Sequence, residues 1–204
     1  MLITTTPNDY SQPTSYTSDN TNITTSTILD LYKLDGFQKL CDVTNSFKYS
    51  PRHRRIYNGQ FFYENIDQNL MYNYHTSWVY MIVSDNEIVK IGETGQPLGM
   101  RKKDTRNDGQ PLKDTSCRMG RLSSQKDGTK NDTDQVIREA LFNDCLAGKV
   151  SIWVKKCDYI ESEITIAGAK TIVYSKMHKD LEKKYLDHYH SLKKCYPYLN
   201  SGRA

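Results

Sequence analysis

The sequence predicts an α+β fold: a small three-stranded antiparallel sheet flanked by helices and preceded by an N-terminal extension. Three observations lead to this expectation. A hairpin-like pair of strand segments lies in the middle of the chain, two amphipathic helical patterns follow it, and an alternating strand lies between those helices. The 204 residues are enough for one hydrophobic core and a tail. No apolar run approaches the roughly 18 residues of a membrane span, so no membrane partner is expected.

Residues 1–27 are expected to form a flexible arm, because Ser and Thr dominate them and apolar side chains are scarce. Residues 28–77 form the predicted extension. It begins with a helical pattern over Ile28–Cys41 that Gly36 weakens, so a short or broken helix is expected. The following stretch, Phe47–Tyr74, has no clear periodicity and predicts neither helix nor strand.

The strongest local pattern is a hairpin made by Trp78–Val83 and Glu87–Gly92, with turn-forming residues between them. If the connecting loop has three residues, Tyr80 lies directly opposite Lys90, with Cβ atoms about 5 Å apart. A two-residue loop at Asp85-Asn86 would shift the pairing by one residue and separate the two side chains.

Capping residues, glycine and proline set the limits of the remaining elements. The second helical pattern is the clearest, because apolar residues recur at helical spacing before a closing glycine. The expected elements are a short basic helix over Leu98–Arg106, a helix from Asp132 or Thr133 to Gly148, a strand over Val150–Val154, a strand pair of Ile164–Ile166 with Thr171–Val173, and a final helix over Lys176–Lys194.

Positive charge is concentrated in one segment. The formal net charge is +4, yet residues 1–50 carry three Lys and five Asp, so the basic excess lies in the rest of the chain. Residues 96–130 contain nine Lys or Arg against four Asp. This composition favours a polyanion such as nucleic acid as the partner, although a solvated helix and loop face has a similar composition. The segment Pro51–Arg55 is a second candidate for phosphate contacts.

The cysteines and histidines predict no metal cluster. The five cysteines are odd in number and contain no C-x-x-C pair, so neither a disulfide framework nor a zinc site is expected. His178, His188 and His190 lack metal-ligand spacing and are expected at the surface or the edge of the core. The N-terminus lacks the basic and apolar regions of a secretory signal, so a cytoplasmic location is expected.

Val79-Tyr80-Met81 and, ten residues later, Lys90-Ile91-Gly92 resemble the paired motifs of the GIY-YIG nuclease superfamily. The resemblance extends over residues 78–200. Three further positions match the family in order and spacing: the catalytic arginine at Arg101, the metal-binding glutamate at Glu182 and the closing asparagine at Asn200.

The chain departs from the family pattern at three points. The first motif lacks its leading Gly and Ile, and Thr105 stands where many members have His or Tyr. Lys90 replaces the usual second tyrosine, which is similar to a subset of small type II restriction endonucleases in the superfamily. A competing alignment places Arg118 or Arg121 on the scissile phosphate in place of Arg101.

The resemblance implies a sequence-specific, metal-dependent endonuclease that cuts double-stranded DNA. Tyr80 would be the general base, and Lys90 would favour its tyrosinate or take the proton itself. Arg101 would hold the scissile phosphate, Glu182 would hold one divalent cation, expected to be Mg²⁺, and Asn200 would orient neighbouring groups. Residues 78–204 would be the nuclease core, with a basic insertion at 96–130.

DNA contacts are expected from the insertion and the extension. Lys102, Lys103 and Arg106 would grip phosphates, and Arg118 and Arg121 would read base edges. A palindromic site cut on both strands implies a homodimer. Two other functions fit the same residues: a phage- or repair-type nuclease that nicks DNA with loose specificity, and a catalytically silent DNA-binding module in which Lys90 marks lost activity.

Overall fold

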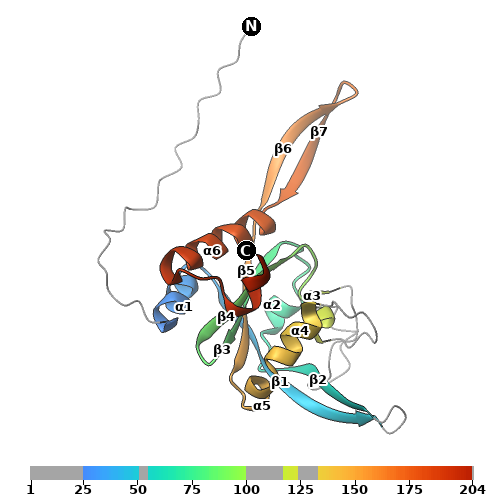
Figure 1. The fold of residues 1–204 in the computed structure, drawn as a ribbon. Coiled ribbons are helices and arrows are strands. Elements are labelled where there is room, and N and C mark those ends of the chain that lie inside the picture. The colour runs from blue at the N-terminus through green and yellow to red at the C-terminus, as the bar shows by residue number, and fades with distance from the viewer. Residues whose placement is uncertain (1–24, 51–54, 100–116, 124–132, 204) are drawn as a thin grey trace.

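The computed structural model describes residues 25–50, 55–99, 117–123 and 133–203 (Figure 1). Within them, five antiparallel strands form one sheet in the order β2-β1-β5-β3-β4, and two more strands form a separate hairpin. The strands are β1 (Gln38–Ser50), β2 (Arg55–Glu64), β3 (Trp78–Ser84), β4 (Glu87–Thr94), β5 (Val150–Lys156), β6 (Tyr159–Ile166) and β7 (Ala169–Lys176).

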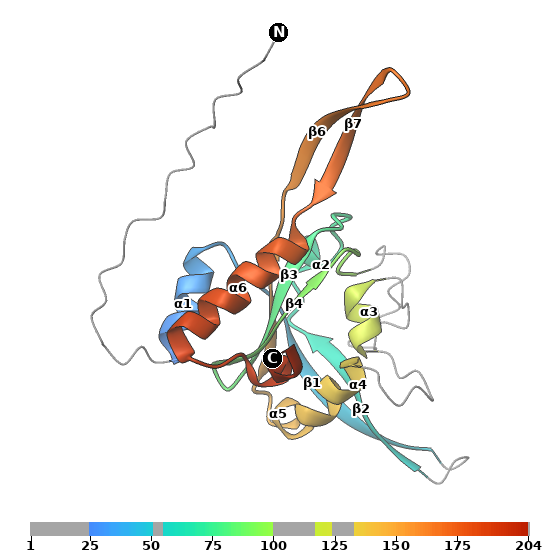
Figure 2. The same ribbon diagram turned by 45° about the horizontal axis from the view of Figure 1, so that its top comes forward.

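Helices cover both faces of the sheet, which makes three layers (Figures 1 and 2). The helices are α1 (Thr25–Leu34), α2 (Gln68–Met71), α3 (Arg118–Ser123), α4 (Thr133–Ala140), α5 (Phe142–Leu146), α6 (His178–Lys193) and the 3₁₀ helix η1 (Tyr198–Arg203). One face packs against α2 to α5 and the other against α1 and α6. Within the described residues, no helix has the length and apolar character needed to cross a membrane.

Strand β3 lies inside the sheet and is buried at every position. Because side chains alternate along a strand, Tyr80 and Ile82 enter the core beneath α2 to α5, whereas Val79, Met81 and Val83 enter the core beneath α1 and α6. A strand covered on both faces reads as a continuous apolar run, which is the pattern that predicted it.

The expected three-stranded sheet is corrected to five strands. Strands β1 and β2 come from the predicted extension, and β1 pairs with β5, so the sheet continues across the boundary expected at residue 78. A register shift between Lys39 and Cys41 inserts an extra residue into β1, and a second shift, between Ser46 and Lys48, interrupts the pairing of β1 with β2. The first shift breaks the alternation of buried and exposed side chains, because Leu40 and Cys41 are both buried, and for this reason the sequence pattern does not reveal the strand.

The β3–β4 hairpin closes with a two-residue turn. Asp85 and Asn86 both have positive φ, as a type I′ turn requires. Between Val83 and Ile82 the pairing of the two strands then shifts by one residue, so that Tyr80 pairs with Gly92 and Ile82 pairs with Lys90. The direct opposition of Tyr80 and Lys90 is therefore wrong. The shift nevertheless returns Lys90 to the face of Tyr80, as a diagonal neighbour.

Most other predicted elements are found with altered limits, whereas the short basic helix expected over Leu98–Arg106 lies outside the described residues from position 100 onward. Helix α1 ends before Gly36, whose φ is +94°, which is the expected break. The predicted helix over residues 133–148 is divided into α4 and α5 near Leu141, while Ile137, Leu141 and Cys145 keep one stripe toward the core. Helix α6 agrees with the prediction, and β6–β7 projects from the body as a hairpin longer than expected (Figure 1).

Candidate active site

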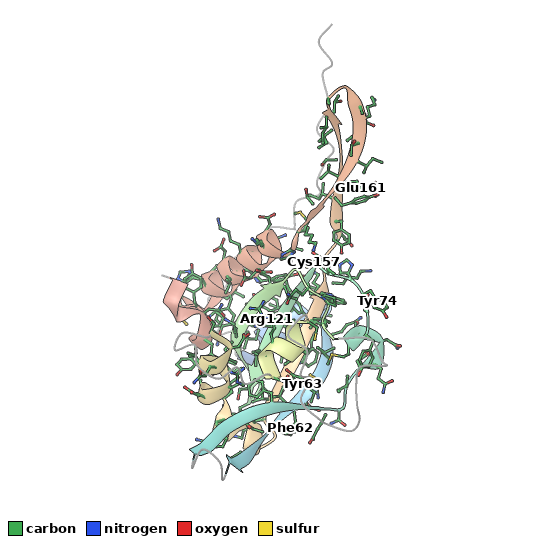
Figure 3. All side chains as sticks on the ribbon, turned by 90° about the vertical axis from the view of Figure 1, so that its right-hand side faces the viewer. Phe62, Tyr63, Tyr74, Arg121, Cys157 and Glu161 are labelled. Carbon is green, nitrogen blue, oxygen red and sulfur yellow. The ribbon has the colours of Figure 1, made fainter. Side chains whose placement is uncertain are left out.

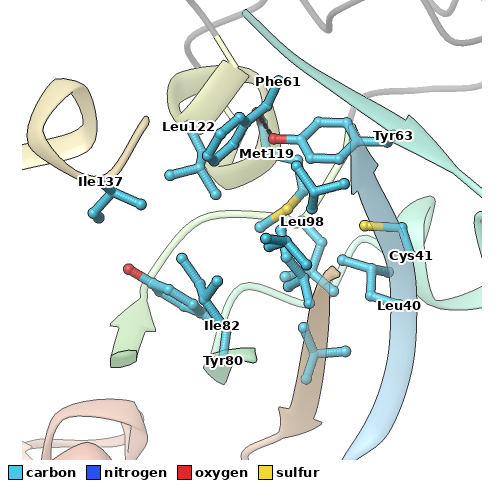
Figure 4. Close-up of a cluster of buried hydrophobic side chains, with 14 of the residues drawn as sticks. Leu40, Cys41, Phe61, Tyr63, Tyr80, Ile82, Leu98, Met119, Leu122 and Ile137 are labelled. Carbon is cyan, nitrogen blue, oxygen red and sulfur yellow. Dashed lines mark hydrogen bonds between the residues drawn. The ribbon is translucent and has the colours of Figure 1, made fainter. Parts of the chain in front are cut away.

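Tyr80 and Gly92 are paired across β3 and β4, and the phenol ring of Tyr80 lies over the glycine. A Cβ atom at position 92 would be 2.4 Å from both the hydroxyl oxygen and Cζ of Tyr80. Any larger residue at this position would push the ring away. Figure 4 shows Tyr80 at the margin of the buried cluster, with its hydroxyl turned toward Ile137. The glycine of the second motif is thus explained by the tyrosine of the first.

Arg118, the first residue of α3, contacts this phenol from the helical layer. Its Nη2 donates a 2.6 Å hydrogen bond to the Tyr80 hydroxyl, and its Cζ lies 4.8 Å from the centre of the ring. Backbone hydrogen bonds to Pro97 and Leu98 anchor the start of α3, and the Tyr63 hydroxyl donates to the Met119 carbonyl at 2.8 Å. The guanidinium is therefore fixed against the phenol by main-chain contacts as well as by its own.

Asp134, in the first turn of α4, holds the other side of the guanidinium. Arg118 Nη1 donates to Oδ2 of Asp134 at 3.0 Å, and Nη2 donates to Oδ1 at 2.8 Å. Arg118 is 9% exposed and Asp134 is 5% exposed, so the pair is screened from water. Such a two-pronged, buried ion pair has fixed geometry. Arg118 Nε is buried and has no hydrogen-bond partner within the described part of the chain.

Burial and charge act in opposite directions on the Tyr80 phenol. Burial raises its pKa above the ordinary value, Arg118 lowers it by charge and by hydrogen bonding, and the negative charges of Asp134 and Glu182 raise it further. The net result is a raised pKa, so the phenol is protonated in this state. Burial also opposes the charge of Arg118, but Tyr80 and Asp134 outweigh it and raise the pKa of the guanidinium.

Lys90 and Asn200 meet where β4, an edge strand, receives the C-terminal segment. The Asn200 side chain donates to the Ile91 carbonyl and accepts from the Ile91 N–H, each at 2.8 Å. In the described part of the chain, β4 has a neighbouring strand on one side only. At Ile91 the Asn200 side chain makes the backbone hydrogen bonds that a strand on the other side would make. Lys90 Nζ lies 3.4 Å from the Leu199 carbonyl oxygen, and its side chain is buried.

Glu182 lies on the core-facing stripe of α6 and is 6% exposed. One turn earlier on the same stripe, the His178 ring lies between the Ser77 hydroxyl, at 3.3 Å, and the Glu93 carboxylate, at 3.2 Å. These contacts fix the start of α6 against the ends of β3 and β4. His178 is buried, although the sequence predicts it at the surface or the edge of the core. Its i, i+4 spacing from Glu182 is the sequence signal that places both side chains on the same face of the helix.

The structure brings together Tyr80, Arg118 and Lys90 on one side of the β3–β4 hairpin, with Asn200 fixing β4 and the charge of Glu182 acting on the phenol. Arg118 is buried, so in this state it is not available to read base edges. Arg121 is exposed on the outer side of α3 (Figure 3). The remaining predicted site residues, Arg101, Lys102, Lys103 and Arg106, lie outside the described residues.

Asp134 is the participant that sequence reasoning missed. At the start of a helix an acidic residue is ordinarily explained by the helix dipole, so its pairing with Arg118 leaves no separate signal. In the described residues no three His, Cys, Asp or Glu side chains form a metal-binding group. A Mg²⁺ ion requires fewer protein ligands, because one or two carboxylates, water and phosphate oxygens complete its coordination.

No family model and no curated protein matches this sequence. Among solved structures, the chain is similar to the restriction endonuclease HPY188I in complex with product DNA, at 17% sequence identity and a TM-score of 0.35. The similarity covers 83% of this chain and 82% of that one.

Proposed function

We propose that this protein is a metal-dependent endonuclease of the GIY-YIG type that cuts double-stranded DNA at a specific sequence, as type II restriction enzymes do. The observation that carries the proposal is the contact of Arg118 with the Tyr80 hydroxyl above Gly92. It places the tyrosine of the first motif, packed on the glycine of the second, against a cation suited to a phosphate. Position 118 is one of the alternatives that the sequence left open, and its contact with Tyr80 supports this choice.

In this mechanism the active form of Tyr80 is the tyrosinate, formed when the phenol loses its proton to solvent as the site opens, and the tyrosinate then accepts a proton from the attacking water. Arg118 stabilises that tyrosinate through its hydrogen bond and its charge, and the same charge suits a phosphoryl oxygen. Asn200 holds β4 so that Lys90 and Gly92 keep their places beside the phenol. Glu182 would hold Mg²⁺, which when bound stabilises charge on phosphate and leaving oxygens.

Access to the phenol requires a change of state. Tyr80 is 3% exposed, so a phosphate reaches its hydroxyl only after the groups that cover it have moved. The raised pKa of Tyr80 has the same consequence, since burial is its largest cause. We therefore propose that this is the resting form of the site and that bound DNA produces the active one.

The proposed partners are double-stranded DNA and a second copy of the chain. Arg121 is exposed beside the site, and Lys102, Lys103 and Arg106 belong to the same basic insertion of the sequence. Cutting both strands of a palindrome calls for two sites related by two-fold symmetry. Sedimentation of the protein with and without a DNA duplex tests this part of the proposal: two chains per cut duplex are expected.

The test of the function is a digest of defined DNA with Mg²⁺, followed by mapping of the ends. One consensus sequence with both strands cut is expected. Tyr80→Phe and Glu182→Ala should each lose at least about 100-fold in rate, while Tyr80→Phe still binds DNA. Tyr189→Phe, which changes a buried tyrosine on α6, and Glu161→Ala, which changes an exposed glutamate on β6, are the matched controls and should cut normally.

The same digest separates two other functions. Scattered nicks without a consensus would indicate a nicking nuclease of loose specificity. The buried, protonated phenol favours a silent DNA-binding module as the second candidate. Binding of duplex DNA without any cutting after long incubation with Mg²⁺ would support that candidate and contradict the enzyme.

A further inference from the structure

Arg118 has more bonds than a free phosphate-binding arginine would have. A carboxylate, a phenol and a guanidinium from α4, β3 and α3 are joined in one buried chain, in which Nη2 serves both Asp134 and Tyr80. The carboxylate of Asp134 occupies both terminal nitrogens, in the two-pronged geometry with which arginine also binds a phosphate. Asp134 and an incoming phosphate therefore need the same atoms.

We propose that Asp134 is a positioning residue that holds Arg118 against Tyr80 and competes with the DNA phosphate for the guanidinium. The inference rests on the proposed function, since it assumes that a phosphate reaches this site. It adds a residue that the two motifs do not contain. Asp134 keeps the cation aligned with the phenol for cleavage, and it weakens the binding of DNA until a phosphate displaces part of the ion pair.

The burial of the pair explains why the competition is strong. A buried charge needs a counter-charge, and Asp134 supplies it in the DNA-free state. Without Asp134, the described contact that remains for the terminal nitrogens is the uncharged Tyr80 hydroxyl. A phosphate would then be the available counter-charge, so the affinity for DNA should rise when Asp134 is neutralised.

The orphaned Nε of Arg118 is a second, independent observation. It is buried and has no hydrogen-bond partner within the described residues, although nearly all buried donors in folded proteins have one. The two terminal nitrogens are satisfied while the third position of the fork is not. A group that accepts hydrogen bonds, such as a phosphate oxygen, would satisfy it.

Asp134→Asn is the informative variant, because asparagine keeps the shape of the side chain and one acceptor oxygen but removes the charge. We expect binding of a cognate duplex, measured with Ca²⁺ in place of Mg²⁺, to become about tenfold tighter. We expect the single-turnover cleavage rate with Mg²⁺ to fall about tenfold or more, since Arg118 is no longer held on the phenol. A merely structural role would weaken binding and cleavage together.

Three further variants keep the inference falsifiable. Asp144→Asn on α5 removes the charge of a carboxylate that accepts a 2.6 Å hydrogen bond from Ser84, and it should change neither measurement. Asp134→Glu keeps the charge, so this variant should bind DNA with the wild-type affinity. It provides the binding measurement at position 134 if Asp134→Asn does not fold. In the double variant Arg118→Ala with Asp134→Asn, the gain in affinity should vanish, because the gain depends on Arg118.

The outcomes distinguish this inference from the proposed function. A wild-type protein that neither binds nor cuts DNA overturns both. A wild-type protein that cuts DNA, with an Asp134→Asn variant that binds no more tightly, overturns only the role of Asp134. Tighter binding with slower cleavage in Asp134→Asn, and its loss in the double variant, would support the competition.

Discussion

The phenol of Tyr80 occupies the space that a side chain at Gly92 would need. A Cβ atom at position 92 would lie 2.4 Å from the Tyr80 hydroxyl. Two residues that are twelve positions apart in the sequence are thus fitted to one another by packing. The pairing explains why a glycine ends the second motif and links the shape of the hairpin directly to the proposed chemistry.

Gly92→Ala should therefore displace the Tyr80 ring and separate it from Arg118. We expect cleavage per folded molecule to fall about 100-fold or more, with a stability loss of about 1–3 kcal/mol from overpacking. Urea unfolding and single-turnover cleavage measure the two effects. Gly148→Ala is the control: no atom lies within 4 Å of its added Cβ, but its positive φ costs stability, so stability should fall without loss of cleavage per folded molecule. Equal activity in both variants would contradict the account.

Asn200 should act on the site through β4 and without touching DNA. Asn200→Ala removes both hydrogen bonds to Ile91, and we expect it to lower the free energy of unfolding by about 1–3 kcal/mol. The turnover rate should fall while KM stays near the wild-type value, because the position of Lys90 and Gly92 changes but no DNA contact is lost. Asn65→Ala removes one exposed hydrogen bond to Asp42 at a position of positive φ, so it should lower stability while leaving the turnover rate near the wild-type value. A higher KM with an unchanged turnover rate would argue that Asn200 contacts DNA.

The buried tyrosines predict a loss of stability at alkaline pH. Burial raises the pKa of Tyr80 and raises the pKa of Tyr189 to about 12. An unfolded tyrosine ionises near pH 10, so above that pH the unfolded state loses protons that the folded state retains. The free energy of unfolding should hold its full value below about pH 10 and fall as the pH rises toward 12. Urea titrations between pH 8 and 11.5 test this, and Tyr189→Phe should flatten the slope. A profile that rises above pH 10 would contradict the burial of these phenols.

The fold was partly predictable from the sequence, and the reason differs between elements. The hairpin, β5 and α6 have regular patterns of apolar residues because each packs against the core along its whole length. Strands β1 and β2 gave no such signal, since the register shift at Lys39/Cys41 buries two successive residues of β1 and a second shift interrupts the pairing of β1 with β2. For that reason the sequence predicted a sheet of three strands where the structure has five.

The parts of the candidate site that depend on local motifs could be read from the sequence. Tyr80 and Gly92 lie on the two strands of the predicted hairpin, whereas the partners of Arg118 depend on how α3 and α4 pack. Asp134 is 16 residues from Arg118, and no periodicity links residues on two short helices. The register of the hairpin was wrong for a similar reason, because a single-residue bulge leaves no clear mark in the sequence.

The most direct test compares two arginines of the same helix. Arg118→Lys keeps the positive charge but loses the fork that joins Asp134 and Tyr80, whereas Arg121→Lys changes an exposed residue on α3. With Mg²⁺ and cognate duplex saturated by excess protein, so that weaker DNA binding does not lower the rate, single-turnover cleavage with mapped ends should show Arg118→Lys slower by about 100-fold and Arg121→Lys within about threefold of the wild type. Wild-type cleavage rates in Arg118→Lys, or intact DNA with the wild-type protein, would contradict the proposed site.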